Sequence, residues 1–287
     1  MRLESQIVKA RDGIELFVRS YWPDQPDPER TLYWVHGLGE HGGRHVHVAQ
    51  LLAENGWRMI VADLRGHGRS GGVPTYVRSF DDYASDIALI WEQLGLNDAP
   101  PVLLGHSMGG LVAVRTVQTG SVEPSALVLS SPLLGLKLRV NPFTVMLGRM
   151  LVRFYPTVRF SNGIDPTNMT RDSEFAALRR SDNLINKTVT AGWFVAMQSA
   201  LSAAKQDASK VSLPVLALQG ENDLTTDPVA LAEWWDRIQS TEKNLIVYPN
   251  HVHELFFEPD WRATTLQMLN WLEQRNRKFA TATDQVT

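Results

Sequence analysis

Two histidines, His251 and His253, lie two residues apart in the stretch YPNHVHELFFEP near the end of the chain. A His-x-His pair can supply two ligands to a metal ion, whereas a single loop histidine can act as the general base of a hydrolase. In an extended segment, residues two apart point to the same face, so the spacing does not select one histidine over the other. The stretch therefore leaves two kinds of chemistry open.

A serine that could act as a nucleophile lies in the segment Gly105-His106-Ser107-Met108-Gly109. The apolar run PVLL precedes it and the helical pattern GGLVAVRTVQT follows it, so Ser107 is predicted at a tight turn from a strand to a helix. Such a turn exposes the hydroxyl above the sheet edge, and the flanking glycines remove side chains that would clash there. The amino terminus of the helix also stabilises negative charge. These features favour a nucleophile over the alternative, a serine that caps an ordinary helix.

A nucleophilic serine needs a base and an acid that orients the base. In hydrolases with this turn, the order along the chain is Ser, then Asp or Glu, then His. The apolar run LPVLALQG leads into Glu221-Asn222-Asp223, and NLIVYP leads into the loop with the two histidines. We predict Asp223 as the acid. Glu221 and Asp227 are rivals, although Asp227 before Pro228 is typical of a helix cap.

A metal-dependent hydrolase is an alternative, because histidines also crowd one earlier stretch: His36, His41, His45 and His47. No H-E-x-x-H motif is present, since Phe257 stands where the second histidine would fall after His253-Glu254. A metal site would also leave the serine turn and Asp223 without a role. No metal and no other cofactor is therefore expected. A non-catalytic binding protein is a further alternative, which the presence of all three reactive residues disfavours.

The composition excludes several other classes of function. The 287 residues carry 28 basic and 31 acidic side chains, a net charge of −3, whereas a nucleic-acid partner requires a basic excess. The absence of cysteine excludes disulfides, zinc thiolates and a thiol nucleophile. The amino terminus MRLESQIVKARDG lacks the apolar run of a signal peptide, and no apolar run approaches the roughly 18 residues that a membrane span needs. We therefore predict a cytoplasmic protein.

The elements that must position these residues alternate between strands and helices. Residues 1–22 are predicted to form a hairpin that turns at Arg11-Asp12-Gly13. Beyond it, continuous apolar runs suit strands covered on both faces, and the helices between them favour parallel pairing in an α/β fold. The expected strands are 31–37, 57–63, 101–107, 126–131, 213–220 and 244–249, and the expected helices are 45–55, 80–94, 108–119, 228–239 and 260–277.

The alternation stops between Leu133 and Ser209, where no segment has a convincing strand pattern. The apolar residues there recur at helical spacing instead. The simplest interpretation is one α/β core, residues 1–132 and 210–287, with an all-helical cap inserted at 133–209.

Five motifs follow one another along the chain: HGLGEH from His36, DLRGHGRSGG from Asp63, GHSMGG from Gly105, LQGENDLTTDP from Leu218 and YPNHVHELFFEP from Tyr248. Together they resemble the monoacylglycerol lipase and lysophospholipase branch of the α/β-hydrolase superfamily, among the serine aminopeptidase S33-type hydrolases. The resemblance covers nearly all of the predicted sheet domain and is weak across the insertion. It implies an α/β-hydrolase fold with a cap over the active site.

The resemblance also assigns individual residues. In that family the last motif has one histidine directly before a glutamate, which selects His253 rather than His251 as the base. The implied oxyanion donors are the backbone N–H groups of Leu38 and Met108, and the glycines of HGLG allow the close backbone approach that such a donor needs. His36 and His106 are expected to hold backbone instead.

The sequence thus predicts a serine hydrolase that cleaves carboxylic esters through an acyl-enzyme, with Ser107 as nucleophile, His253 as base and Asp223 as the orienting acid. The resemblance implies a monoacylglycerol or a lysophospholipid as substrate. A small-ester carboxylesterase and an acyltransferase use the same triad, and both stay open as alternatives.

The first part of the predicted cap, residues 133–164, carries basic and no acidic side chains: Lys137, Arg139, Arg149, Arg153 and Arg159. Its apolar residues recur at helical spacing: Phe143, Met146, Leu147, Met150, Leu151 and Phe154. One interpretation is a stripe that packs on the core. The other is a stripe that binds the acyl chain, through Met146 and Met150 among others, or that meets an anionic membrane whose lipid phosphates the arginines contact.

A second cap helix is predicted in TAGWFVAMQSALSAA, which begins at Thr190. It presents Trp193, Phe194 and Met197, which suit an acyl chain and are equally typical of a core. The segment RDSEFAALRRSDNL, which begins at Arg171, is charged and is predicted to be solvated.

Overall fold

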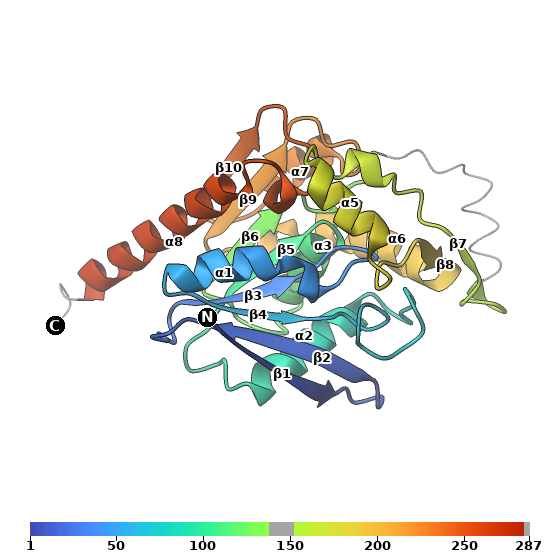
Figure 1. The fold of residues 1–287 in the computed structure, drawn as a ribbon, viewed down its shortest axis with the longest axis horizontal. Helices are drawn as coiled ribbons and strands as arrows, with labels where there is room; N and C mark the ends of the chain where they lie inside the picture. Colours follow the sequence, from blue (N-terminus) through green and yellow to red (C-terminus); the bar gives the residue numbers. More distant parts are fainter. Residues whose placement is uncertain (138–151, 284–287) are drawn as a thin grey trace.

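The computed structural model describes residues 1–137 and 152–283, with side chains up to residue 277. An eight-stranded sheet runs through the molecule in the order β1-β2-β4-β3-β5-β6-β9-β10 (Figure 1). The strands are β1 (Arg2–Lys9), β2 (Glu15–Trp22), β3 (Thr31–Val35), β4 (Arg58–Ala62), β5 (Val102–His106), β6 (Ala126–Ser130), β9 (Val215–Gly220) and β10 (Lys243–Tyr248).

The central strands form because their side chains are covered on both faces of the sheet. Every residue of β3, β5 and β6 is buried, as continuous apolar runs require. These strands pair in parallel, with Leu32 opposite Val102 and Leu103 opposite Leu127. From β4 to β10 all neighbours are parallel, whereas the β1–β2 hairpin is antiparallel and joins β4 in antiparallel register. The predicted α/β-hydrolase fold is confirmed.

Helices cover the two faces of the sheet. Leu32 and Trp34 of β3 belong to the core shared with α1 and α8, whereas Tyr33 and Val35 point to the opposite core with α2, α3 and α6. Figure 1 shows α1 and α8 in front of the strands and α3 behind them. The helices are α1 (Val46–Glu54), α2 (Asp81–Gln93), α3 (Met108–Gln118), α5 (Ser173–Ser181), α6 (Ala191–Gln206), α7 (Pro228–Trp235) and α8 (Trp261–Thr283), with 3-10 turns η1 (Gly42–His45), η2 (Pro166–Asn168), η3 (Ala208–Lys210) and η4 (Leu255–Phe257).

The segment between β6 and β9 corresponds to the predicted cap, and the prediction that it is all helical is wrong. Two strands, β7 (Arg159–Ser161) and β8 (Thr188–Thr190), pair in antiparallel register. Each has three residues, too few for an alternating pattern to emerge in the sequence. The limits 133 and 209 set for the insertion stay a prediction. Among the described residues, no helix is long and apolar enough to cross a bilayer.

Candidate active site

Three loops at the carboxyl edge of the parallel strands bring the predicted reactive residues together. Ser107 follows β5 and begins α3, Asp223 follows β9, and His253 lies in the loop after β10. Parallel strands deliver their carboxyl ends to the same edge of a sheet, so residues far apart in sequence meet there.

At the turn from β5 to α3, Ser107 has a backbone conformation, φ 53° and ψ −119°, that residues other than glycine rarely adopt. Two glycines make this turn possible. A Cβ at Gly105 would overlap the Gly109 carbonyl oxygen, and a Cβ at Gly109 would overlap the carbonyl oxygens of Val35 and His36. The strain holds the hydroxyl of Ser107 in one orientation at the start of α3.

The three side chains form one chain of hydrogen bonds. Nε2 of His253 lies 2.9 Å from Oγ of Ser107, and Nδ1 of His253 lies 2.8 Å from Oδ2 of Asp223. With Asp223 ionised, Nδ1–H donates to the carboxylate and Nε2 is left to accept the serine proton. All three side chains are buried from bulk water. This geometry is that of a nucleophile, a base and an acid that orients the base.

Asp223 is held in its ionised form. Thr225 and Thr226 donate backbone N–H groups to its Oδ1, over 2.7 and 3.1 Å, and the Thr226 hydroxyl donates to Oδ2 over 2.7 Å. Burial by itself would raise the pKa of Asp223, but His253 and these hydrogen bonds outweigh it and hold the pKa well below its usual range. The rivals lie elsewhere: Glu221 accepts from the Asn250 N–H, and Asp227 caps α7.

His251 faces away from the serine. Its Nδ1 lies 3.0 Å from the Pro249 carbonyl oxygen, and its Nε2 lies 2.9 Å from Oδ1 of Asp260. The two histidines of the loop therefore have different partners, and only His253 contacts Ser107 and Asp223.

The two predicted oxyanion donors come from opposite sides of the serine. Met108 follows Ser107 at the first position of α3, and Leu38 follows Gly37, where a Cβ would crowd the Cβ of Ser107 at 3.3 Å. Within the described residues, neither N–H donates to a backbone acceptor. Both therefore stay the predicted oxyanion donors beside Ser107.

The other histidines of the motifs hold backbone. Nε2 of His36 accepts the Leu64 N–H over 2.9 Å, and Nδ1 of His106 lies 3.2 Å from the Ser130 carbonyl oxygen. Burial and the neighbouring His67 lower the pKa of His36 to about 3, and burial and His253 lower the pKa of His106 to about 4. Both imidazoles are therefore neutral at physiological pH.

The histidine cluster of residues 36–47 is dispersed in the fold. His41 contacts Asp182 of the cap at 2.8 Å, and His47 donates to the Phe256 carbonyl oxygen at 2.8 Å and packs on three aromatic rings. His47 is therefore partly covered by Phe175 of the cap and Phe257 of η4. Across residues 1–137 and 152–277, no group of three or more His, Asp or Glu side chains is arranged to hold a metal ion.

A small cavity of about 20 Å³ lies beside the serine, and both the cap and the core line it. The cap contributes Ile164, Met169 and Arg179, and the core contributes Leu38 and the reactive residues. The predicted acyl-chain residues Trp193, Phe194 and Met197 are not among those that line it, because they are buried in the core where α6 packs on α3. The other two predicted residues, Met146 and Met150, lie outside the described residues. Of the apolar stripe predicted between Phe143 and Phe154, only Phe154 is described.

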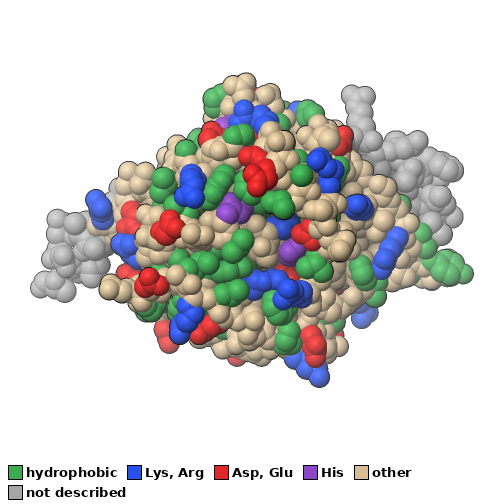
Figure 2. All heavy atoms as spheres, viewed as in Figure 1, with side chains coloured by type: hydrophobic (Ala, Val, Ile, Leu, Met, Phe, Trp, Pro, Cys, Tyr) green, Lys and Arg blue, Asp and Glu red, His purple; other side chains and the backbone are tan. Residues whose placement is uncertain are grey.

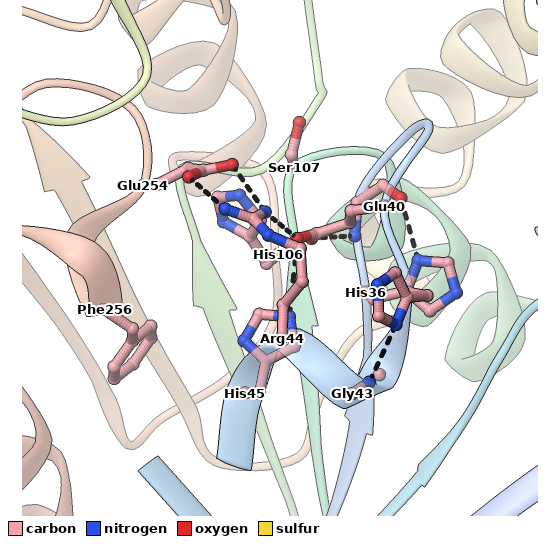
Figure 3. Close-up of polar contacts among 12 residues, drawn as sticks. His36, Glu40, Gly43, Arg44, His45, His106, Ser107, Glu254 and Phe256 are labelled. Carbon is pink, nitrogen blue, oxygen red and sulfur yellow. Dashed lines mark hydrogen bonds and ion pairs between the residues drawn. The ribbon is translucent and has the colours of Figure 1, made fainter. Parts of the chain in front are cut away.

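Four buried charged side chains beside the serine were not predicted from the sequence. Arg44 lies between two carboxylates and donates to Glu40 over 2.5 Å and to both oxygens of Glu254 over 3.0 and 2.9 Å (Figure 3). Arg179 of α5 donates to Glu254 over 2.5 Å. We call these four residues the charge quartet. The only sequence signal was the presence of Glu40 and Glu254 inside the motifs, and Arg44 and Arg179 gave none.

The prediction that the segment from Arg171 to Leu184 is solvated is confirmed for most of its residues and is wrong at Arg179. Arg179 is only 6% exposed, Arg171 pairs with Glu258 at 2.7 Å, and Asp182 pairs with His41. Charged residues on an amphipathic segment usually face water, but here the partners come from the core and lie far away in the sequence.

The fold and this site define a serine hydrolase of the α/β-hydrolase class. The family described as "Serine aminopeptidase, S33" matches residues 26–260. A monoacylglycerol lipase from Mycolicibacterium smegmatis is 30% identical over 259 residues, which cover 89% of this chain and 92% of that protein. An uncharacterized abhydrolase domain-containing protein from Dictyostelium discoideum is also 30% identical over 256 residues, 88% of this chain, but the chain spans only 27% of that protein's length.

The crystal structure of a monoacylglycerol lipase from Paleococcus ferrophilus superposes with a TM-score of 0.82 at 28% identity, over 90% of this chain and 98% of that chain. The chain belongs to the serine aminopeptidase S33 family of α/β-hydrolases. It is a carboxylic ester hydrolase, the enzyme class expected from its sequence.

Proposed function

We propose that the chain hydrolyses monoacylglycerols through an acyl-enzyme on Ser107, with His253 as the base and Asp223 as its orienting partner. The observation that carries this proposal is the continuous hydrogen-bonded chain from Ser107 Oγ through His253 to Asp223. The names of the relatives support the substrate class.

The first half of the reaction transfers the acyl group to the enzyme. Nε2 of His253 takes the hydroxyl proton as Ser107 Oγ bonds to the ester carbon, and the carbonyl electron pair moves to its oxygen. The N–H groups of Leu38 and Met108 hold the resulting oxyanion. His253 then gives its proton to the leaving glycerol oxygen as the C–O bond breaks, and the ionised Asp223 stabilises the imidazolium meanwhile.

The second half repeats these steps with water. His253 removes a proton from water, the hydroxide attacks the acyl carbon, and Ser107 leaves with the proton. The products are a fatty acid and the regenerated enzyme. If an alcohol accepted the acyl group in place of water, the same residues would catalyse acyl transfer, and the chain would be an acyltransferase.

The test is a substrate series with one inactive control. Hydrolysis of p-nitrophenyl esters of increasing chain length is measured beside monoacylglycerol and lysophosphatidylcholine, and Ser107→Ala serves as the control. We expect monoacylglycerol to be the best substrate and the Ala variant to lose at least about 10⁴-fold in kcat. Equal activity of Ser107→Ala would refute the mechanism. A preference for short esters or for lysophosphatidylcholine would refute the substrate class while leaving the mechanism intact.

We also propose that the cap contacts an anionic membrane surface, where such substrates reside. Its support lies in the described part of the cap, where Phe154 is 73% exposed and Tyr155 is 64% exposed, between Arg153 and Arg159. Aromatic rings favour the membrane interface, and arginine heads favour lipid phosphate. Figure 2 shows hydrophobic side chains beside Lys and Arg at the β7 end of this face. Arg149, the other arginine of this hypothesis, lies outside the described residues.

Sedimentation with vesicles tests this contact. Arg153→Glu/Arg159→Glu should weaken binding to phosphatidylserine vesicles and leave hydrolysis of a soluble short ester unchanged. A matched control with the same change of charge is Lys9→Glu/Arg11→Glu in the exposed hairpin of the core. Equal loss of binding in the two variants would mean a nonspecific charge effect, and equal retention would mean no membrane contact by this surface. A cytoplasmic location stays a prediction.

A further inference from the structure

The charge quartet connects the cap to the two loops that carry the proposed oxyanion donor and the proposed base. Its members are buried, and they come from three separate parts of the chain: Glu40 and Arg44, Glu254, and Arg179 of the cap. Two carboxylates and two guanidinium groups make the quartet neutral. A buried cluster of this kind is stable only while each charge keeps its partners.

The first connection runs to the loop from Gly37 to Glu40, which carries the proposed oxyanion donor Leu38 and which we call the oxyanion loop. Oε1 of Glu40 accepts the Gly37 N–H over 2.6 Å, and Oε2 of Glu40 accepts from Arg44. Gly37 immediately precedes Leu38, so Glu40 fixes the peptide chain next to the proposed oxyanion donor. In Figure 3, the carboxylate of Glu40 lies between the backbone of this loop and Arg44, close to His106 and Ser107.

The second connection runs to the histidine loop. Glu254 follows His253 directly. Its carboxylate accepts hydrogen bonds from Nη1 and Nη2 of Arg44 and from Nη1 of Arg179. Its backbone N–H donates to the Met169 carbonyl oxygen of the cap over 2.7 Å. The cap therefore holds the residue after His253 by its backbone and by its side chain.

The charge of Arg179 is needed to balance the quartet. Without it, Arg44 would be the one guanidinium of the quartet left beside two buried carboxylates, with the His45 imidazole 3.5 Å from Glu40, and the other three members would carry a net negative charge. Burial by itself would raise the pKa of Glu254, but Arg44 and Arg179 lower it to about 2. Loss of Arg179 would change how the hydrogen bonds of Arg44 are divided between Glu40 and Glu254. Both carboxylates would then shift, and the two loops that carry them would shift as well.

We propose that Arg179 of the cap is a positioning residue for the reaction: through Glu254, Arg44 and Glu40 it holds the histidine loop and the oxyanion loop in their reactive geometry. The inference rests on the proposed triad. It makes the docked cap a part of the machinery for acyl transfer rather than only a cover for the substrate.

Three single variants test this role with a soluble short ester, p-nitrophenyl butyrate, in the full chain. Arg179→Met should lower kcat roughly 10- to 100-fold with little change in KM, because a displaced donor or base slows chemistry more than binding. Arg179→Lys should recover most of the rate, since arginine uses one N–H bond to Glu254 and lysine keeps the charge. Arg180→Met, in the exposed neighbour on α5, is the matched control and should behave as the unmodified chain.

A double variant separates positioning from simple loss of stability. Arg179→Met/Glu254→Gln removes one positive and one negative charge, so the thermal midpoint should rise above that of Arg179→Met while kcat stays low. Recovery of kcat together with the midpoint would overturn the proposal, because the defect would then be one of stability. A kcat for Arg179→Met within about threefold of the unmodified chain, or a Lys variant as slow as the Met variant, would overturn it as well.

Failure of this inference is distinguishable from failure of the proposed function. Ser107→Ala is assayed in parallel, and each variant is titrated with a fluorophosphonate that labels the reactive serine. If Ser107→Ala keeps full activity, the triad is wrong and so is the positioning role. If Ser107→Ala is inactive and Arg179→Met is fully active and labelled, only the positioning role falls.

Discussion

The loops at the carboxyl edge of the sheet and the cap beside them are fixed in different ways. The loops leave parallel strands, of which β3, β5 and β9 are fully buried, and they are shaped by close backbone contacts, such as Gly109 against Val35 and Gly105 against Gly109. The described part of the cap has the short strands β7 and β8 beside helices α5 and α6, and it meets the loops through the packing of Phe175 on Phe257 and through polar contacts between distant segments. Among these are Arg179 with Glu254, Asp182 with His41, Asn186 N–H with the Gly39 carbonyl oxygen, and Glu254 N–H with the Met169 carbonyl oxygen.

This difference separates two ways in which a structure can hold a reactive group. Backbone packing leaves no alternative arrangement, so the serine turn is set when the sheet folds. Polar contacts between distant segments can be lost one at a time, so the geometry they enforce is adjustable. Substitutions in the loops should therefore act in an all-or-none manner, and substitutions in the cap should act by degrees.

The largest expected effect tests the loop side, in the pair of histidines after β10. His253→Gln should lower kcat by about 10⁴-fold or more, because the proposed base is lost. His251→Gln should stay within about threefold, since the imidazole of His251 lies against Pro249, Asp260 and Tyr248 and contacts neither Ser107 nor Asp223. Steady-state kinetics on one ester checks both. Equal losses of kcat in the two variants would mean that the different partners of His251 and His253 do not determine which of them acts as the base.

A pair of glycine substitutions compares the packing of the two regions. Gly109→Ala should lower the free energy of unfolding by about 3 kcal/mol or prevent folding, because its Cβ would overlap rigid backbone atoms. Gly163→Ala in the cap has open space around its Cβ, and only its φ of 70° opposes the change, so the cost should be about 1 kcal/mol. Urea unfolding followed by circular dichroism gives both values. Similar costs would remove the proposed difference in packing.

The smallest effect lies at the seam between the regions, at His47, which packs on Phe175 of the cap. Burial lowers the pKa of His47 to about 4, as it lowers that of His106, while the unfolded chain binds the proton near pH 6.5. Between pH 6.5 and their folded pKa, His47 and His106 therefore bind more protons in the unfolded state than in the folded state. The free energy of unfolding is reduced from its value at pH 7 as the pH falls below about 6.5 towards the folded pKa values.

His47→Gln should flatten this dependence. Removing one such imidazole should reduce the slope of unfolding free energy between pH 6.5 and 5 by up to about 1.4 kcal/mol per pH unit. Urea unfolding across that window measures the slope, and His251→Gln controls for the loss of a histidine. An unchanged slope would show that the cap does not keep His47 from water.

The sequence was informative where the pattern is local. Each parallel strand is one continuous apolar run, and the serine turn needs glycines within two residues of Ser107, so both could be read from short windows. The order of the motifs then brought Asp223 and His253 to the same edge, where the structure joins them by hydrogen bonds. The choice between the two histidines required the family resemblance, since spacing alone left them equivalent.

The cap and the charge quartet could not be predicted in this way. Arg179 and Glu254 are 75 residues apart, and each looks like a solvated charge when its own segment is inspected. The strands β7 and β8 are three residues long and are defined only by each other. Such features depend on pairing between distant segments, which no local pattern encodes.

The position of His253 near the carboxyl end also has a consequence for biosynthesis. Ser107 and His253 are 146 residues apart, and the strand before Ser107 leaves the ribosome long before β9 and β10. At translation rates of about 5–20 residues per second, the nascent chain spends roughly 7–30 seconds with a serine turn but no base. During that interval the growing polypeptide lacks the proposed base, so ester hydrolysis by the proposed triad can begin only after β9, β10 and the loop with His253 have been synthesised.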